Sequence, residues 1–348
     1  MIKLLGVLSF IFICSVLLTG ALLRYAVNKK LLDIPNKRSL HSTSMPRGGG
    51  AAFVILYSII LLAFVAINAS DLSLILSLFL GGILVSGIGF LDDHRPLPAY
   101  VRFIIHIIAA IVVLVMLGSP REIIVNNVNI QLGWFGYIFA LFLIVWLINL
   151  YNFMDGIDGI AALEAICVAV GASLIILFSY TDEVSNYLLS AENKSVIFLL
   201  LALALSVAGF LVWNWPPAKI FMGDVGSGYL GFIISVFVIY SHVTDIVNIW
   251  VWLILLGVFL VDASITLLTR ILTGQQWYEA HRSHAYQHLA QQWGSHKKVT
   301  LSVLAINIIW LLPIAWLAMM VPESGAILTA IAYLPLMIVT LVYRAGRA

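Results

Sequence analysis

Asn152, Asp155 and Asp158 stand three residues apart in the segment NLYNFMDGIDG, residues 149–159. Residues three apart share one face of a helix, so the pattern predicts an amide and two carboxylates that point the same way. Oxygen ligands of this kind suit a hard cation such as Mg²⁺, which binds few carboxylates together with waters and substrate phosphates. The ligand ladder of a calcium EF-hand is absent, whereas an intramembrane sodium site, as in secondary transporters, stays open as an alternative.

A second group of acids ends an apolar run, since Asp92 and Asp93 are adjacent in GFLDDHRPL. Adjacent carboxylates repel, which raises the free energy of ionising both unless a cation lies near. A metal ion or a proton-transfer role would remove that cost; a solvated helix end is the alternative. Arg102 and His106 follow one helical turn apart, where a cation would hold a lipid head group at the membrane interface.

A glycine-rich segment, NWPPAKIFMGDVGSG (residues 214–228), surrounds Asp224. Pro216 and Pro217 should break the preceding apolar helix, and the glycines form a turn able to present backbone N–H groups to phosphate. The G-x-x-x-x-G-K-[ST] spacing of a P-loop is missing, so an acid in this turn fits metal-bound pyrophosphate better. A plain turn in a helical hairpin is the alternative.

Two further segments carry cations. LLDIPNKRSLHSTSMPRGGG (residues 31–50) contains Lys37, Arg38, His41 and Arg47, which either meet phosphate or make an ordinary positively charged cytoplasmic loop.

TGQQWYEAHRSHAYQHLAQQWGSHKK (residues 273–298) contains four histidines, the last of which is His296. His281, His284 and His288 are spaced i, i+3, i+7, which predicts one helical face with Arg282 beside it. Such a face would grip phosphate, because cationic donors bind oxyanions well. A zinc site, which needs several protein ligands in a tetrahedron, is the alternative.

Membrane helices must position these residues. Hydrophobic residues make up 62% of the 348 residues and charged residues only 10%, the mean hydropathy is +1.08, and soluble proteins contain about 25% charged residues. The apolar runs are continuous rather than alternating, which predicts helices and not a β-barrel. Cys14 and Cys167 lie inside such runs, which argues against a disulfide framework or a cysteine metal site. Glu164 and Asp262, deeper in their runs, are expected to be structural.

Eleven windows of the sequence are long and apolar enough to cross the bilayer as helices. They run approximately over residues 4–24, 49–67, 73–91, 102–118, 134–151, 160–179, 195–213, 227–243, 248–272, 299–321 and 325–343. The fourth and eighth are short, so we expect a single polytopic domain over residues 1–348, an all-α bundle of 10–11 transmembrane helices. The first window is interpreted as a retained span, because it exceeds the roughly 7–15 residues of a signal-peptide core.

The segments between the windows differ in charge. Of the 18 Lys and Arg residues, 15 fall in one alternating set of loops, and the other set holds only Lys3, Arg121 and Lys194. By the positive-inside rule the first set is cytoplasmic, at about residues 25–48, 92–101, 152–159, 214–226 and 273–298. The N-terminus is then periplasmic, the C-terminus is cytoplasmic, and the candidate acids gather at the cytoplasmic face, where they predict an active site.

Taken together, LDD, NFMDGIDG, NWPPAKIFMGDVGS and the late histidine-containing loop resemble the polyprenyl-phosphate N-acetylhexosamine-1-phosphate transferases, glycosyltransferase family 4. The likeness runs in order from about residue 33 to residue 290. DIPNKRSLHSTSMPRGGG and HRSHAYQ look more like enzymes that start O-antigen or common-antigen synthesis than like the phospho-MurNAc-pentapeptide translocase. Only His284 matches a histidine of the family loop; Tyr286 and Gln287 stand where later histidines would be, so His281 and His288 receive no role.

The resemblance implies roles for individual residues. Asp224 would be the main Mg²⁺ ligand and Asn152 a second, with Mn²⁺ as an alternative metal. Asp92 resembles the acid that deprotonates the lipid phosphate, Asp93 resembles its partner near the metal, and His284 completes the predicted catalytic set. The predicted substrate-binding residues are Arg47 of the basic loop, Asp155, Asp158, Asn214 and Phe221 around uridine, Arg102 at the lipid phosphate, and Arg282 near the donor pyrophosphate or sugar.

The implied reaction moves an N-acetylated amino-sugar 1-phosphate from a UDP-sugar to undecaprenyl phosphate in a bacterial inner membrane, and releases UMP. The lipid-linked product would initiate O-antigen or other cell-envelope polysaccharide synthesis. Both substrates are anionic, and phosphoryl-type transfer depends on positioning and charge neutralisation, which a metal and basic residues supply. The alternative is a cation-coupled transporter that uses the same acids, although its acids should lie near mid-membrane. No nucleic acid partner is expected, and the apolar outer faces permit a homodimer.

Overall fold

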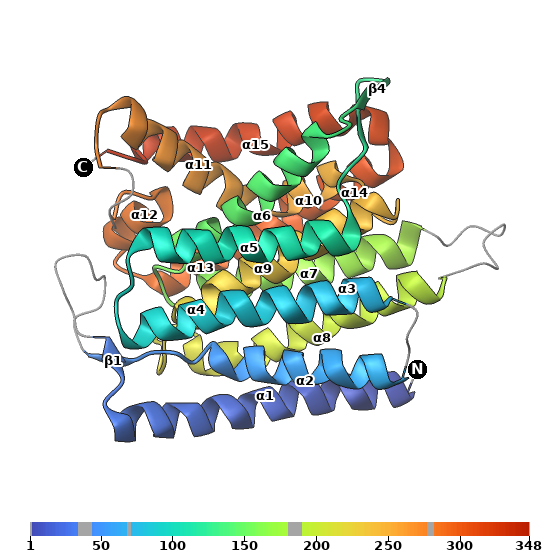
Figure 1. Cartoon of the computed structure of the whole chain (residues 1–348). Helices are drawn as coiled ribbons and strands as arrows, with labels where there is room; N and C mark the ends of the chain where they lie inside the picture. The colour runs from blue at the N-terminus through green and yellow to red at the C-terminus, as the bar shows by residue number, and fades with distance from the viewer. Residues whose placement is uncertain (1, 34–43, 68–70, 180–189, 277–281, 348) are drawn as a thin grey trace.

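The computed structural model describes residues 2–33, 44–67, 71–179, 190–276 and 282–347. Four polar candidates lie outside these residues, namely Lys37, Arg38, His41 and His281. The described chain folds into a bundle of helices that run roughly side by side (Figure 1). Because lipid offers no hydrogen bonds to the backbone, continuous apolar runs pair their N–H and C=O groups within helices. The predicted all-α polytopic membrane fold is confirmed.

Each apolar window falls in a helix or in a series of joined helices. In chain order these are α1 (Ile2–Lys29), α2 (Ala51–Ile67), α3 (Leu72–Leu76) with η1 (Ser77–Gly81) and α4 (Gly82–His94), α5 (Ala99–Leu117), α6 (Phe135–Met154), α7 (Ile160–Ser179), α8 (Ala191–Asn214), α9 (Asp224–Val243), α10 (Ile249–Leu255) with α11 (Gly257–Leu272), α13 (His296–Ile306) with η2 (Asn307–Leu311) and α14 (Leu312–Met320), and η3 (Pro322–Ser324) with α15 (Gly325–Val342). The remaining elements are α12 (Ala285–Trp293) and two hairpins, β1 (Leu32–Asp33) with β2 (Met45–Pro46) and β3 (Glu122–Val125) with β4 (Val128–Gln131).

Nine helices of the described chain are long and apolar enough to cross a membrane, and α10 with α11 makes a tenth if this pair, bent by 77°, counts as one span. α2 is also apolar but is shorter than these spans, with 17 residues. We expected the fourth and eighth windows to be short, but α5 has 19 residues and α9 has 20. Both helices extend beyond their apolar windows, because α5 begins at Ala99 and α9 begins at Asp224.

α9 forms the centre of the bundle. Every residue of α9 from Val225 to Ser241 is buried, and the helix packs against α4 and α6. This close approach requires a glycine, because a Cβ at Gly231 would lie 2.2 Å from the carbonyl oxygen of Leu147 on α6. The N-terminal end of α9 therefore has a position fixed by its neighbours, and Asp224 stands at that end.

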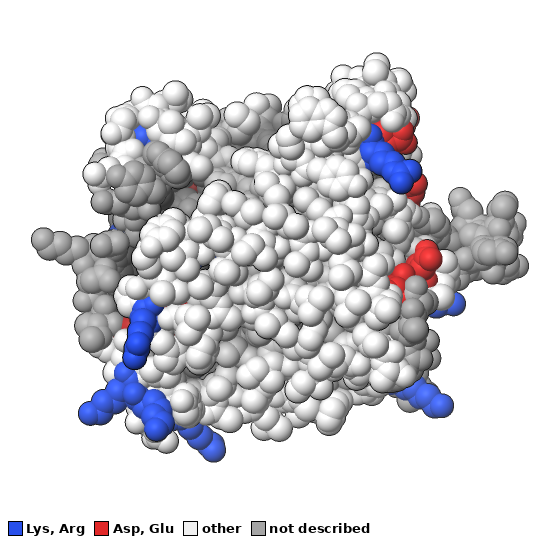
Figure 2. Space-filling view, in the orientation of Figure 1, with Lys and Arg blue, Asp and Glu red and all other residues white. Residues whose placement is uncertain are grey.

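Polar features gather at two ends of the bundle. Figure 1 shows the C-terminus, β1 and α12 at one end, which we call the C-terminal end, and the N-terminus and β4 at the other. Figure 2 shows charged side chains at both ends, with a broad uncharged belt between them on the face in view. Such a belt is the surface that a protein presents to the hydrocarbon of a bilayer.

Candidate active site

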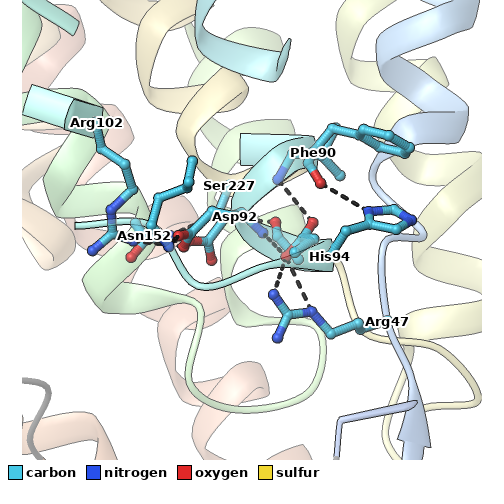
Figure 3. A network of polar contacts seen from close by, with 12 residues as sticks. Arg47, Phe90, Asp92, His94, Arg102, Asn152 and Ser227 are labelled. Atoms are coloured by element: carbon cyan, nitrogen blue, oxygen red, sulfur yellow. Dashed lines mark hydrogen bonds and ion pairs between the residues drawn. The ribbon is translucent and has the colours of Figure 1, made fainter. Parts of the chain in front are cut away.

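Four helices bring polar residues together at the C-terminal end of the bundle (Figure 3). α4 ends with Asp92 and Asp93, α9 begins with Asp224, α5 carries Arg102 in its first turn, and α6 carries Asn152 near its end. All five were predicted as site residues from the sequence, and the structure brings them into one connected network.

Asp93 holds the N-terminal end of α9. Its Oδ1 accepts the backbone N–H of Asp224 at 3.0 Å, and its Oδ2 accepts that of Val225 at 3.2 Å. The N-terminus of a helix carries unpaired N–H groups and partial positive charge, so a carboxylate there is favourable. The Asp93 side chain is only 3% exposed. Both of its oxygens are therefore used within the protein, and Asp93 positions Asp224 rather than facing an open site.

Arg47 balances the charge of Asp93. Its Nε and Nη2 donate to Asp93 Oδ1 at 3.1 and 2.6 Å (Figure 3). Burial by itself would lower the pKa of Arg47, but the negative charge of Asp93 and their hydrogen bond raise that pKa above its usual value. Arg47 follows β2, which lies against the glycine turn because the N–H of Phe221 donates to the Pro46 carbonyl at 2.8 Å.

Arg102 bridges two acids that come from different helices. Its Nη1 lies 2.8 Å from Asp92 Oδ2 and 3.1 Å from Asp224 Oδ2. The other oxygen of Asp92 accepts the backbone N–H of Leu97 at 2.6 Å, which fixes the carboxylate at the end of α4. The two acids lie close enough to interact directly, so the guanidinium offsets a repulsion that would otherwise oppose their ionisation.

Asn152 joins this network from α6. Its amide donates to Ser227 Oγ at 3.2 Å and also hydrogen-bonds the Asp224 carboxylate. Figure 3 shows Asn152 and Ser227 side by side next to Asp92. An amide and two carboxylates thus converge on one region of the C-terminal end.

The prediction that Asp155 and Asp158 share a helical face with Asn152 is wrong. α6 ends at Met154, Asp155 leaves the helix with φ −87° and ψ 45°, and α7 begins only at Ile160. Two glycines in this segment favour a turn, and Gly159 takes a φ of 76°. The pKa of Asp155 is raised well above its usual value, first by desolvation and then by the negative charges of Asp224, Asp93 and Asp158.

Asp158 braces this turn against two other segments. Its Oδ2 accepts the backbone N–H of Ala218 at 3.1 Å and lies 3.3 Å from His296 Nδ1. Asn214, buried at the end of α8, makes a similar link, because its Oδ1 accepts the N–H of Gly159 at 2.9 Å and its amide donates to the Ile220 carbonyl at 2.9 Å. These side chains hold the turn and the glycine-rich segment together, while Phe221 is half-buried in the latter.

We had expected His284 to lie on a helical face with the other histidines. In the structure it instead stands directly before α12. It is the N-cap of α12, 2% exposed, and its Nδ1 lies 3.3 Å from Asp262 Oδ1 on α11. Asp262 also accepts the backbone N–H groups of Ala285 and Tyr286, each at 3.0 Å. Arg282 precedes His284 and is half-buried.

Tyr286 connects α12 to the turn after α6. Its hydroxyl donates to the carbonyl of Phe153 at 3.0 Å, next to Asn152 in the chain. The pKa of Tyr286 is raised well above its usual value, first by burial and then by the charges of Asp262 and Asp155. A Cβ at Gly156 would lie 2.1 Å from the Tyr286 hydroxyl, so this contact requires a glycine. The histidine loop therefore docks beside the acidic network.

Sequence reasoning gave Asp262 only a structural role and assigned none to Tyr286 or Ser227. Asp262 had a usable signal, because an acid inside an apolar span is costly and needs a partner. Tyr286 and Ser227 had none, because their partners, Phe153 and Asn152, are far away in the chain.

The donor set fits a hard metal ion bound partly by substrate. Among the described residues, no three His, Cys, Asp or Glu side chains form a complete metal site. Mg²⁺ does not require one, because it keeps several waters and takes substrate phosphates as ligands. The oxygens of Asp224, Asp92 and Asn152 suit such an ion, provided that Arg102 shares or gives up its contacts with the two acids.

Known proteins resemble the part of the chain that carries the acidic network. Residues 75–242 match the family model described as Glycosyl transferase family 4. A probable undecaprenyl-phosphate N-acetylglucosaminyl 1-phosphate transferase of Bacillus subtilis is 29% identical over 300 residues, which cover 84% of this chain and 79% of that protein. Phospho-N-acetylmuramoyl-pentapeptide-transferases of Carboxydothermus hydrogenoformans and Staphylococcus carnosus are 26% and 27% identical, over 84% and 86% of this chain and 90% and 94% of those proteins. The chain therefore carries a glycosyl transferase family 4 domain, which confirms the family expected from its motifs.

Proposed function

We propose that the protein transfers an N-acetylated amino-sugar 1-phosphate from a UDP-sugar to undecaprenyl phosphate and releases UMP. The lipid-linked diphospho-sugar would initiate O-antigen or another cell-envelope polysaccharide. One observation carries the proposal: Arg102 bridges Asp92 and Asp224 where four helices end, beside a surface apolar enough for lipid. Such a site can join a soluble anionic donor to a membrane-borne anionic acceptor. The names of these relatives, which include undecaprenyl phosphate and N-acetylated sugars, support the same substrates.

The proposed step forms one P–O bond and breaks another. An oxygen of the lipid phosphate attacks the β-phosphorus of the UDP-sugar, and the bond from that phosphorus to the bridging oxygen breaks, so that UMP leaves with the electron pair. Arg102 binds the lipid phosphate, and in doing so releases Asp92 Oδ2, now 2.8 Å from its guanidinium. The freed carboxylate then accepts the proton of the incoming phosphate.

Asp224 and Asn152 would hold Mg²⁺, or Mn²⁺ in its place, and the bound ion would offset the charge of the donor pyrophosphate. Asp93 keeps Asp224 in place through the N–H groups at the start of α9. Arg47 balances Asp93, and its 29% exposed guanidinium can also meet a substrate phosphate. Positioning of this kind supplies much of the catalysis in phosphoryl transfer.

The nucleotide pocket in this proposal lies between the turn after α6 and the segment after α8. Asp155 and Phe221 would contact uridine, whereas Asp158 and Asn214 shape the pocket by tying these two segments together. His284 and Arg282 would meet the donor pyrophosphate or sugar from the other side.

The C-terminal end of the bundle would face the cytoplasm of a bacterium, and the membrane would be the inner membrane. The N-terminus lies at the opposite end of the bundle (Figure 1). Cytoplasmic loops carry an excess of Lys and Arg, and 15 of the 18 such residues fall in the loops assigned to this end.

The test is release of UMP by the purified protein in the presence of Mg²⁺, undecaprenyl phosphate and a panel of UDP-N-acetylhexosamines. We expect turnover with at least one donor, loss of turnover on chelation, and recovery with Mg²⁺ or Mn²⁺. Asp224→Asn should abolish turnover. A folded protein that releases no UMP with any donor would contradict the transferase assignment.

A cation-coupled transporter predicts a different outcome. Liposomes that contain the protein would then move Na⁺ or H⁺ with a solute and would release no UMP. The acidic network favours the transferase, because its residues lie at helix ends at one side of the bundle and not in the middle of the spans.

A further inference from the structure

A small cavity adjoins the acidic network between α4, α5, α6 and α9. Its volume is about 50 Å³, whereas one water needs roughly 10–15 Å³, so it is large enough for several waters or for a compact anion. Arg102, Asn152 and Asp224 contribute to its lining, so it opens into the proposed site. Deeper in the bundle it is lined by His106 and Asn149 and by apolar side chains of α4 and α6.

His106 is the least satisfied polar group of this cavity. It lies on α5, one helical turn beyond Arg102 and on the same face, and it is only 8% exposed. Its Nδ1 is buried without a hydrogen-bond partner, and no hydrogen bond to either ring nitrogen is found among the described residues. Leaving such a group unpaired destabilises the folded protein. The residue therefore has the features of a group that is paired when a ligand is bound.

We propose that His106 is a substrate-binding residue whose imidazole hydrogen-bonds the phosphate of the polyprenyl substrate. This inference rests on the proposed function. Arg102 supplies the charge that attracts the phosphate, and His106 supplies a directed hydrogen bond, since a neutral imidazole donates at one nitrogen and accepts at the other. Together, Arg102 and His106 would orient the lipid phosphate, and with it the nucleophilic oxygen, at the edge of the apolar belt.

Depth in the bundle favours the lipid over the nucleotide as the ligand of His106. From Arg102 to His106 the helix runs toward the apolar belt, and the outer side of the same turn carries Phe103 and Ile104, each 51% exposed. A phosphate at the head of an apolar chain can reach this depth while its chain stays in lipid. The segments proposed to hold the donor's uridine, tied together by Asp158 and Asn214, lie in loops at the C-terminal end.

The test compares His106→Leu, which removes both ring nitrogens, with His106→Gln, which keeps a donor and an acceptor. Val113→Ala is the matched control, because Val113 is fully buried two turns further along the same face of α5 and does not line the cavity. For His106→Leu we expect the KM for undecaprenyl phosphate to rise about five- to tenfold, as loss of one neutral hydrogen bond implies. The KM for the UDP-sugar should stay unchanged, His106→Gln should recover part of the effect, and Val113→Ala should leave both KM values as they are.

A binding assay without donor separates the two proposals. Thermal melting of the detergent-solubilised protein is measured with undecaprenyl phosphate, with phosphatidic acid and with inorganic phosphate. We expect undecaprenyl phosphate to raise the Tm of the wild type and of His106→Gln, and to raise that of His106→Leu much less. An unchanged KM and an unchanged Tm response in His106→Leu would overturn the role of His106, as would an equal His106-dependent response to inorganic phosphate or phosphatidic acid. Absence of UMP release from the wild type would contradict the function and not this binding result.

Discussion

Asp262 and His284 form a buried pair in which Asp262 Oδ1 lies 3.3 Å from His284 Nδ1. The same carboxylate accepts the N–H groups of Ala285 and Tyr286 and the hydroxyl of Thr266. Since an ionised carboxylate only accepts hydrogen bonds, this contact favours the His284 tautomer that carries the proton on Nδ1 and leaves Nε2 as the acceptor. Asp262 therefore sets both the tautomer of His284 and the start of α12.

Asp262→Asn should lower kcat about tenfold or more, as loss of a partner that orients a functional histidine commonly does. Its amide would place a donor against backbone N–H groups and would favour the other tautomer of His284. UMP release measures the effect. Asp71→Asn is the control, because Asp71 is a buried acid on a different element that accepts the Tyr240 hydroxyl at 2.7 Å. Equal losses in both variants would mean that the effect is a general loss of folding.

Gly89→Ala should displace Asp224 and reduce activity. A Cβ at Gly89 would lie 2.4 Å from the Asp224 carbonyl oxygen, and overpacking of this kind costs about 1–3 kcal/mol. Gly87→Ala is matched to it, since Gly87 is in the same helix and a Cβ there meets no atom within 4 Å. We expect a lower Tm and slow UMP release for Gly89→Ala only. Normal kinetics in Gly89→Ala would show that the bundle tolerates a shift of α9.

Asp93→Asn should raise the Mg²⁺ concentration required for half-maximal activity. The variant weakens the cap of α9, worth about 1 kcal/mol, and leaves Arg47 without its carboxylate, so Asp224 loses its fixed position. A Mg²⁺ titration of UMP release gives the result directly. A fall in kcat with an unchanged Mg²⁺ requirement would argue instead that Asp93 takes part in the chemistry itself.

Tyr286→Phe should raise the KM for the UDP-sugar severalfold and change stability little. The variant loses only the hydroxyl that donates to the Phe153 carbonyl, and a net hydrogen bond is worth about 1 kcal/mol. Tyr333→Phe removes a comparable bond, to the Leu253 carbonyl at 2.7 Å within the bundle, and should leave the KM unchanged. If both variants behave alike, the link between α12 and the turn after α6 has no role in donor binding.

The membrane helices were predictable because each depends on a local property, a long apolar run. Their ends were less predictable, because an apolar window stops at a charged residue while the helix does not. α5 starts at Ala99, before its apolar window, and α9 starts at Asp224 because Asp93 of α4 caps it. The sequence contains both acids of that cap, but nothing local to either residue indicates that they meet.

The candidate site was likewise predictable only in part from the sequence. Motifs identified Asp92, Asp93, Asn152 and Asp224, and the structure joins them. The three-residue spacing led us to expect a helix through Asp158, although Gly156 and Gly159 allow the chain to turn after Met154. Periodicity identifies a helical face only where the backbone stays helical, and tertiary contacts decided that here.

The central place of α9 has a mechanical consequence. Bilayers differ in thickness, and a helix that faces lipid responds to a mismatch by tilting or bending. Every α9 residue from Val225 to Ser241 is covered by protein, so this helix has almost no surface on which the hydrocarbon can act. A change of membrane thickness would strain the outer helices first, and the acid at the start of α9 would keep its height relative to the capping acid of α4.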